Sequence, residues 1–89
     1  MLVEIKGTLK VIFAEEKISD KMSKKEIVVT IGADTEYPQD IICEAVNKKI
    51  DLLDGYSMGE NVVVKCDLRG RESKGRYYNK FSIVDISKK

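Results

Sequence analysis

The first stretch of the chain alternates between apolar and polar positions with a period of two. Four apolar side chains and one glycine share one parity over residues 2–14, namely Val3, Ile5, Gly7, Leu9 and Val11. Because neighbouring residues of a strand point to opposite faces, this pattern predicts a long strand with one face in water. Gly7 in its interior indicates a sharp bend or the close approach of another backbone.

The same reasoning predicts four further strands, at residues 24–32, 40–46, 61–70 and 76–86. The second strand has Ile27, Val29 and Ile31 on its inner row. The third is apolar on both parities, so periodicity does not orient it. The fourth alternates most regularly, and its inner row comprises Val62, Val64, Cys66 and Leu68. Residues 15–23 and 71–75 lack a clear period and are predicted to be connecting loops, the first of them mobile.

After the third strand the pattern becomes helical. We predict that Asn47 caps a short helix, that Ile50 and Leu53 face the core, and that Gly55 ends the helix. The order is then three strands, one short helix and two strands, in a single domain of residues 1–89. This order predicts an all-β fold with one short helix, the five-stranded OB barrel. A β-grasp fold and an SH3-like barrel are the alternatives, and the position of the helix favours the OB fold.

The chain has no histidine, which excludes most catalytic chemistry. It offers no imidazole base, no Ser-His or Cys-His pair and no histidine ligand for a metal. Cys43 and Cys66 form no CxxC motif, so we expect two buried, reduced thiols, no metal and no cofactor. No apolar run is long enough for a signal peptide or a membrane span. We therefore expect a soluble cytoplasmic protein that binds a partner and is not an enzyme.

The charges are divided unevenly along the chain, although the formal net charge is only +1. Residues 1–61 hold eight basic and twelve acidic side chains, a net charge of −4. Residues 62–89 hold eight basic and three acidic side chains, a net charge of +5, and they include every arginine of the protein. An asymmetry of this kind indicates a negatively charged partner on one side of the fold, although a basic surface can also serve solubility alone.

The stretch from Arg69 to Lys80 combines cations with aromatic rings. Six cations are expected beside the loop at residues 71–75: Lys65, Arg69, Arg71, Lys74, Arg76 and Lys80. Proteins bind single-stranded nucleic acid with cations along the backbone and aromatic faces under the bases, and OB folds use this loop for oligonucleotides. Tyr78 shares its parity with Lys80, so we expect Tyr78 to be exposed and Tyr77 to fill the end of the barrel.

These features predict sequence-tolerant binding of single-stranded DNA, with secondary contacts from Lys6, Lys10 and Lys24. Scattered acidic residues are expected to keep one face free of nucleic acid: Asp34, Glu36, Asp40, Glu44, Asp51, Asp54 and Glu60. Three alternatives stay open. Both tyrosines could cap the core beside a merely solvated basic rim, the groove could bind single-stranded RNA, or Val28, Val63 and an edge strand could form a protein interface.

Several short motifs, in this order along the chain, resemble a family of small, uncharacterised bacterial and phage OB-fold proteins. They are Tyr37-Pro38, Lys49-Ile50-Asp51, Gly59-Glu60, Arg71-Glu72 and Lys74-Gly75-Arg76-Tyr77-Tyr78. That family is similar in turn to bacterial single-stranded DNA-binding proteins, through Lys6-Gly7-Thr8-Leu9, Val46-Asn47-Lys48-Lys49 and Gly75-Arg76-Tyr77-Tyr78. The resemblance implies an OB fold, single-stranded DNA as partner, a role in DNA replication or repair, and a homo-oligomer, either a dimer or a tetramer.

The sequence departs from those proteins at two places. Val46 stands where the resembled family usually has an aromatic residue at the end of the third strand, which removes one stacking platform. The chain also stops at Ser87-Lys88-Lys89, where single-stranded DNA-binding proteins continue into a tail that recruits partners. We therefore expect any DNA binding to have one stacking platform fewer and to proceed without the recruiting tail, unless a partner supplies it.

Overall fold

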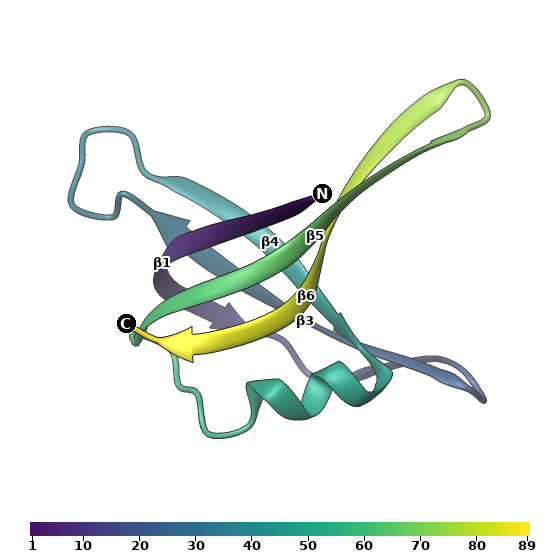
Figure 1. Ribbon diagram of the computed structural model, residues 1–89, viewed down its shortest axis with the longest axis horizontal. Coiled ribbons are helices and arrows are strands. Elements are labelled where there is room, and N and C mark those ends of the chain that lie inside the picture. Colours follow the sequence, from purple (N-terminus) through teal and green to yellow (C-terminus); the bar gives the residue numbers. More distant parts are fainter.

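Six strands and one short helix make up the protein, and the computed structural model describes residues 1–89. The elements are β1 (Leu2–Ile12), β2 (Glu16–Ser19), β3 (Met22–Ile31), β4 (Gln39–Val46), the 3₁₀ helix η1 (Asn47–Leu53), β5 (Asn61–Ser73) and β6 (Arg76–Lys88). Five strands form a ring in the order β1, β5, β6, β4 and β3, and β3 pairs again with β1 (Figure 1). The predicted fold is confirmed: this is the OB-fold order, with the helix between the third and fourth strands of the ring.

β1 belongs to both sides of the ring because it changes partner along its length. Its first part pairs with β5, from Leu2 opposite Asp67 to Thr8 opposite Asn61. Its second part pairs with β3, beginning at Thr8 opposite Thr30. A Cβ atom at Gly7 would overlap the carbonyl oxygen of Thr30 and lie 2.9 Å from the Thr30 carbonyl carbon. The prediction that another backbone approaches closely at Gly7 is therefore confirmed.

The alternation of β1 is broken by a bulge between Leu9 and Val11. Ile5 and Leu9 are buried as predicted, but the extra residue reverses the parity beyond Leu9. Ile12 therefore packs against the core, and Val11 instead pairs with Val28, a residue of the outward row of β3. The prediction that Val11 belongs to the inner row is wrong for this reason.

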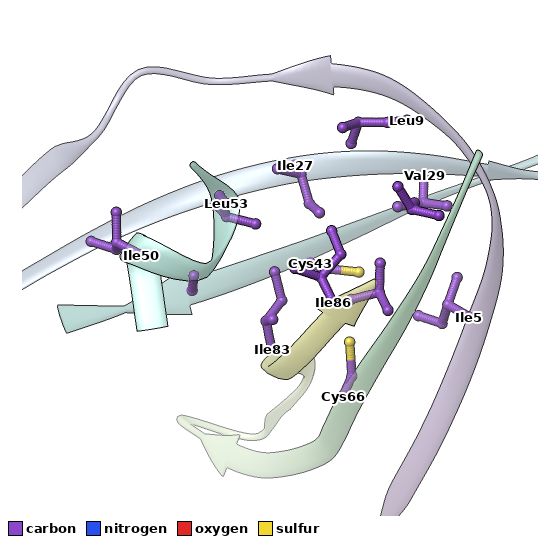
Figure 2. Packing of buried hydrophobic residues seen from close by; sticks show 13 residues of the cluster. Ile5, Leu9, Ile27, Val29, Cys43, Ile50, Leu53, Cys66, Ile83 and Ile86 are labelled. Carbon is purple, nitrogen blue, oxygen red and sulfur yellow. The ribbon is translucent and has the colours of Figure 1, made fainter. Parts of the chain in front are cut away.

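Thirteen buried apolar residues from the five ring strands and η1 form the core (Figure 2). Val62, Val64 and Cys66 of β5 are fully buried, as the alternation of that strand predicts. Cys43 and Cys66 are buried free thiols, as expected. The hydrogen bond between them and their burial raise the pKa of the Cys43 thiol, so this side chain remains protonated and serves as a small core residue.

Two local predictions are corrected by pairing that the sequence does not reveal. Residues 16–19 form the short strand β2 in a hairpin with β3, so the stretch predicted as a loop is partly strand. All four of its residues are exposed, and hence no alternating burial marks it. Asn47 does not cap the helix: it has a φ of 52°, and its Oδ1 accepts a hydrogen bond from the Ser23 backbone N–H at 2.9 Å. Ile50 and Leu53 do face the core.

β5 and β6 continue beyond the ring as a two-stranded hairpin (Figure 1). The pairing of β1 with β5 ends at Leu2 opposite Asp67, and β4 meets β6 only at Glu44 opposite Ser82. We call residues 69–80 the arm. The predicted loop at residues 71–75 is therefore mostly strand, and the turn itself consists of Lys74 and Gly75, both with positive φ.

Candidate nucleic-acid interface

The register of the arm gathers its cations on one side. Arg69 lies opposite Lys80, Arg71 opposite Tyr78, and Ser73 opposite Arg76. Directly paired residues of an antiparallel ladder project to the same face, so four cations and one aromatic ring share a surface. We call this surface the cationic face, and it consists of Arg69, Arg71, Arg76, Tyr78 and Lys80. The alternation read from the sequence places these side chains correctly relative to one another.

The opposite face of the arm carries Tyr77, which pairs with Glu72. Tyr77 is 79% exposed and Tyr78 is 48% exposed. The prediction that Tyr77 fills the end of the barrel is wrong, because the arm leaves the ring and has water on both faces. The alternative in which both tyrosines cap the core is excluded for the same reason.

Tyr78 is the ring that lies among the cations. The guanidinium carbon of Arg71 is 6.0 Å from the centre of the Tyr78 ring, at the outer limit of a cation–π contact. These two residues line a hollow together with Arg69, Gly70, Asn79 and Lys80. The hollow thus joins an aromatic face to three cations, the combination that stacks a base while holding its phosphates.

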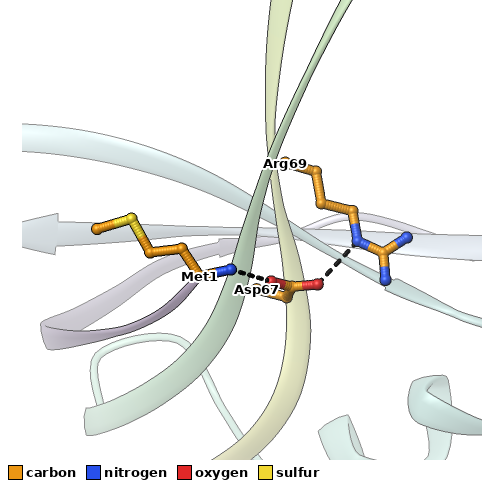
Figure 3. A network of polar contacts seen from close by, with 3 residues as sticks. All are labelled: Met1, Asp67 and Arg69. Atoms are coloured by element: carbon orange, nitrogen blue, oxygen red, sulfur yellow. Dashed lines mark hydrogen bonds and ion pairs between the residues drawn. The ribbon is translucent and has the colours of Figure 1, made fainter.

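Arg69 is oriented by a small polar network at the base of the arm (Figure 3). Asp67 accepts hydrogen bonds from the amino group of Met1 at 3.0 Å and from Nε of Arg69 at 2.9 Å. These two donors hold the pKa of Asp67 below its usual range, so the carboxylate is ionised at neutral pH. The contact uses Nε, so the terminal amino groups of Arg69 remain available to a phosphate.

Lys80 forms an intramolecular ion pair with a carboxylate of β4. Its ammonium group lies 3.5 Å from Glu44, which is only 8% exposed. Glu44 in turn lies directly opposite Glu26 of β3. Glu44, one of the acidic residues expected to keep one face free of nucleic acid, thus borders the cationic face. β4 brings it there because Glu44 is the residue of β4 that pairs with β6, opposite Ser82.

The remaining predicted cations lie outside the cationic face, in the ring or at the tip of the arm. Lys65 lies on the outward row of β5, opposite Glu4 of β1 and Asp85 of β6. Lys74 lies in the turn at the tip of the arm. The predicted secondary contacts are farther from the arm in the ring: Lys6 lines a hollow with Thr8 and Lys89, Lys10 is ion-paired with Asp40 at 2.8 Å, and Lys24 lies opposite Glu16 and Val46. The structure does not bring these three lysines to the cationic face.

The sequence reading did not identify the outward row of β4 as part of the neighbouring surface. Ile42 is 51% exposed and pairs with Val28, which pairs in turn with Val11. Ile42, Glu44, Lys80 and Phe81 line a second hollow beside the arm. A strand that is apolar on both parities must place one apolar row outward. That pattern in residues 40–46 could have predicted the exposed Ile42.

A ring of five strands in this order, with a short helix between β4 and β5, defines a small OB-fold protein. The chain belongs to the family described as "Domain of unknown function (DUF3127)", whose profile matches residues 4–86. The resemblance predicted from the sequence is thereby confirmed. No curated protein matches the chain with significant similarity. No helix of the protein is long and apolar enough to span a membrane.

Three solved structures share the fold at low sequence identity. The mitochondrial single-stranded DNA-binding protein Rim1 of S. cerevisiae is similar with a TM-score of 0.81 and 17% identity, covering 99% of this chain and 94% of that chain. The dimeric N-terminal domain of PriB from Thermoanaerobacter tencongensis gives a TM-score of 0.71 and 13% identity, covering 98% and 93%. The small single-stranded DNA-binding protein of Streptomyces coelicolor gives 0.65 and 14%, covering 100% and 92%.

Proposed function

We propose that this protein binds single-stranded DNA without strong sequence preference, through the cationic face of the arm, and that it acts by binding and not by catalysis. The observation that carries the proposal is the solvent-exposed face on which Arg69, Arg71, Arg76 and Lys80 surround Tyr78. Cations at strand spacing can follow a flexible phosphate backbone, and one ring can support a base of any identity. The neighbours described as single-stranded DNA-binding proteins share this fold, which supports the proposal.

Binding to a labelled oligo-dT, followed by fluorescence anisotropy, tests this function. We expect binding at low salt and a linear fall of log affinity with log salt, because phosphate contacts release counterions from the nucleic acid. Oligo-U of the same length, measured in parallel, separates DNA from RNA as the partner. The proposal is wrong if neither strand binds at 20 mM salt, or if duplex DNA of equal length binds more tightly than the single strand.

Tyr78 and Tyr77 provide a matched pair for testing the stacking contact. Tyr78→Ala is expected to weaken oligo-dT binding by roughly 1–3 kcal/mol, the usual contribution of one stacked base. Tyr77→Ala removes the same side chain from the opposite face of the arm and should change affinity by less than about twofold. Both rings are exposed, so neither change should alter thermal stability appreciably. A larger loss of affinity from Tyr77→Ala than from Tyr78→Ala would mean that the DNA binds to the opposite face of the arm.

A second candidate function is self-association through the outer surface of the ring. The predicted pair Val28 and Val63 is not brought together, since Val63 lies opposite Lys6 and Ser87. Val28 instead joins Val11 and Ile42 in an apolar row across three strands, and β2 offers a free edge beside it. We propose a homo-oligomer on this surface, a dimer or a tetramer. Size-exclusion chromatography with light scattering measures the molar mass of the protein with and without oligo-dT. An oligomer whose mass does not change on addition of oligo-dT favours the interaction function over DNA binding.

A further inference from the structure

Glu44 is the one charged side chain of the protein that is buried. It lies in the outward row of β4, where that strand meets β6, and its exposed fraction is 8%. The ion pair with Lys80, at 3.5 Å, is the one salt bridge it makes. Its cross-strand neighbour on the other side is Glu26, a second carboxylate. Glu44 therefore depends on Lys80 for its compensating positive charge.

The energetics of this arrangement favour keeping Lys80 where it is. A carboxylate that has lost most of its water is costly unless an opposite charge lies close to it. Like charges directly opposite one another on a sheet are destabilising, so Glu26 increases that cost. The separation of 3.5 Å exceeds that of a charge-assisted hydrogen bond, about 2.7–2.9 Å, so the pair is held by charge and not by tight geometry. A phosphate that took Lys80 would leave Glu44 uncompensated.

We propose that Glu44 competes with nucleic-acid phosphate for Lys80 and so marks the inner limit of the binding surface. This inference rests on the proposed function and identifies Glu44 as the residue that weakens DNA binding at this edge of the surface. The arginines of the arm then bind phosphates, and the neighbouring carboxylates Glu26 and Glu44 on the outer face of β3 and β4 repel the nucleic-acid backbone.

Glu44→Gln tests the proposal, because it removes the charge and keeps the shape. We expect the variant to bind oligo-dT roughly three- to tenfold more tightly at 50 mM salt, with a salt slope steeper by about 0.7, the value of one extra phosphate contact on a single strand. Glu36→Gln, in the exposed loop between β3 and β4, changes the net charge equally and should leave the slope unchanged. Equal behaviour of the two variants overturns the proposal.

Lys80→Gln, made in the wild-type and in the Glu44→Gln background, tests the same competition from the side of the lysine. In the wild-type background this change should make the salt slope shallower by less than about 0.35, half the value of one full phosphate contact, because Glu44 competes for Lys80. In the Glu44→Gln background it should abolish the gained affinity. A slope that becomes shallower by about 0.7 in the wild-type background overturns the competition, as does a gain that persists without Lys80. Absence of any binding by the wild-type protein contradicts the proposed function itself and is recognised before either variant is made.

Discussion

Replacing Arg69, Arg71 and Arg76 together by alanine is expected to flatten the salt dependence of oligo-dT binding by about two units of slope. Each phosphate contact on a single strand contributes about 0.7 to that slope, so three contacts account for the change. At 50 mM salt the same relation predicts a loss of affinity of roughly 100- to 1,000-fold. A salt titration of anisotropy from 20 to 300 mM measures both quantities.

Two of the three arginines are already oriented by neighbouring side chains. Arg69 is oriented by Asp67, and Arg71 lies over the Tyr78 ring, so neither side chain needs to be ordered again on binding. Arg76 pairs with Ser73 next to the turn and is exposed. None of the three belongs to the core, and Asp67 keeps the Met1 amino group as its partner after the change. We therefore expect the variant to fold normally.

The matched control replaces the same three residues by lysine. Lysine keeps the charge and loses the planar donor fork, so the salt slope should be retained while affinity falls only several-fold. Equal loss of slope in the alanine and lysine variants would mean that arginine geometry, not charge, makes the contact. An unchanged slope in the alanine variant would show that the arm is not the binding surface.

Much of this site follows from local rules that the sequence obeys. Alternation along residues 62–71 predicts which side chains share a face. In the structure burial alternates from Val62 to Cys66, Leu68 is only half-buried, and beyond it the register with β6 defines the shared face. The same rule places Tyr78 with Lys80. The ring order also follows, because a short helix between the third and fourth ring strands leaves few ways to close a small sheet.

The remainder depends on contacts between distant parts of the chain. Whether Tyr77 is buried depends on where β1 and β4 stop pairing with β5 and β6, and no local pattern reports that limit. The pairing of Lys80 with Glu44 likewise requires β4 to reach β6 at one residue. Asn47 satisfies every local criterion of a helix cap, but Ser23 competes for its side chain. The predictions that failed were those made from sequence neighbours alone, at residues whose surroundings are set by long-range pairing.

Gly7→Ala is expected to destabilise the protein by about 3 kcal/mol or more, a large part of the roughly 5–13 kcal/mol that stabilise a domain of this size. The new methyl group would overlap the backbone carbonyl of Thr30 and crowd Cγ1 of Val29 at 2.9 Å. A backbone carbonyl cannot rotate away as the end of a side chain can. β1 would therefore have to separate from β3 at the residue where it passes from one partner strand to the other.

Gly70→Ala is the matched control, because it adds the same methyl group to a strand where there is room. There the Cβ atom would lie 3.3 Å from Oδ1 of Asn79, the mobile end of an exposed side chain, so we expect a change within about 1 kcal/mol. Urea denaturation followed by circular dichroism compares the two variants. Similar midpoints for the two variants would contradict the inference that only glycine fits at position 7, against the backbone of Thr30. We expect only Gly7→Ala to lower the free energy of unfolding strongly, and we expect it to bind oligo-dT normally below its unfolding transition. That result would show that Gly7 serves stability and not binding.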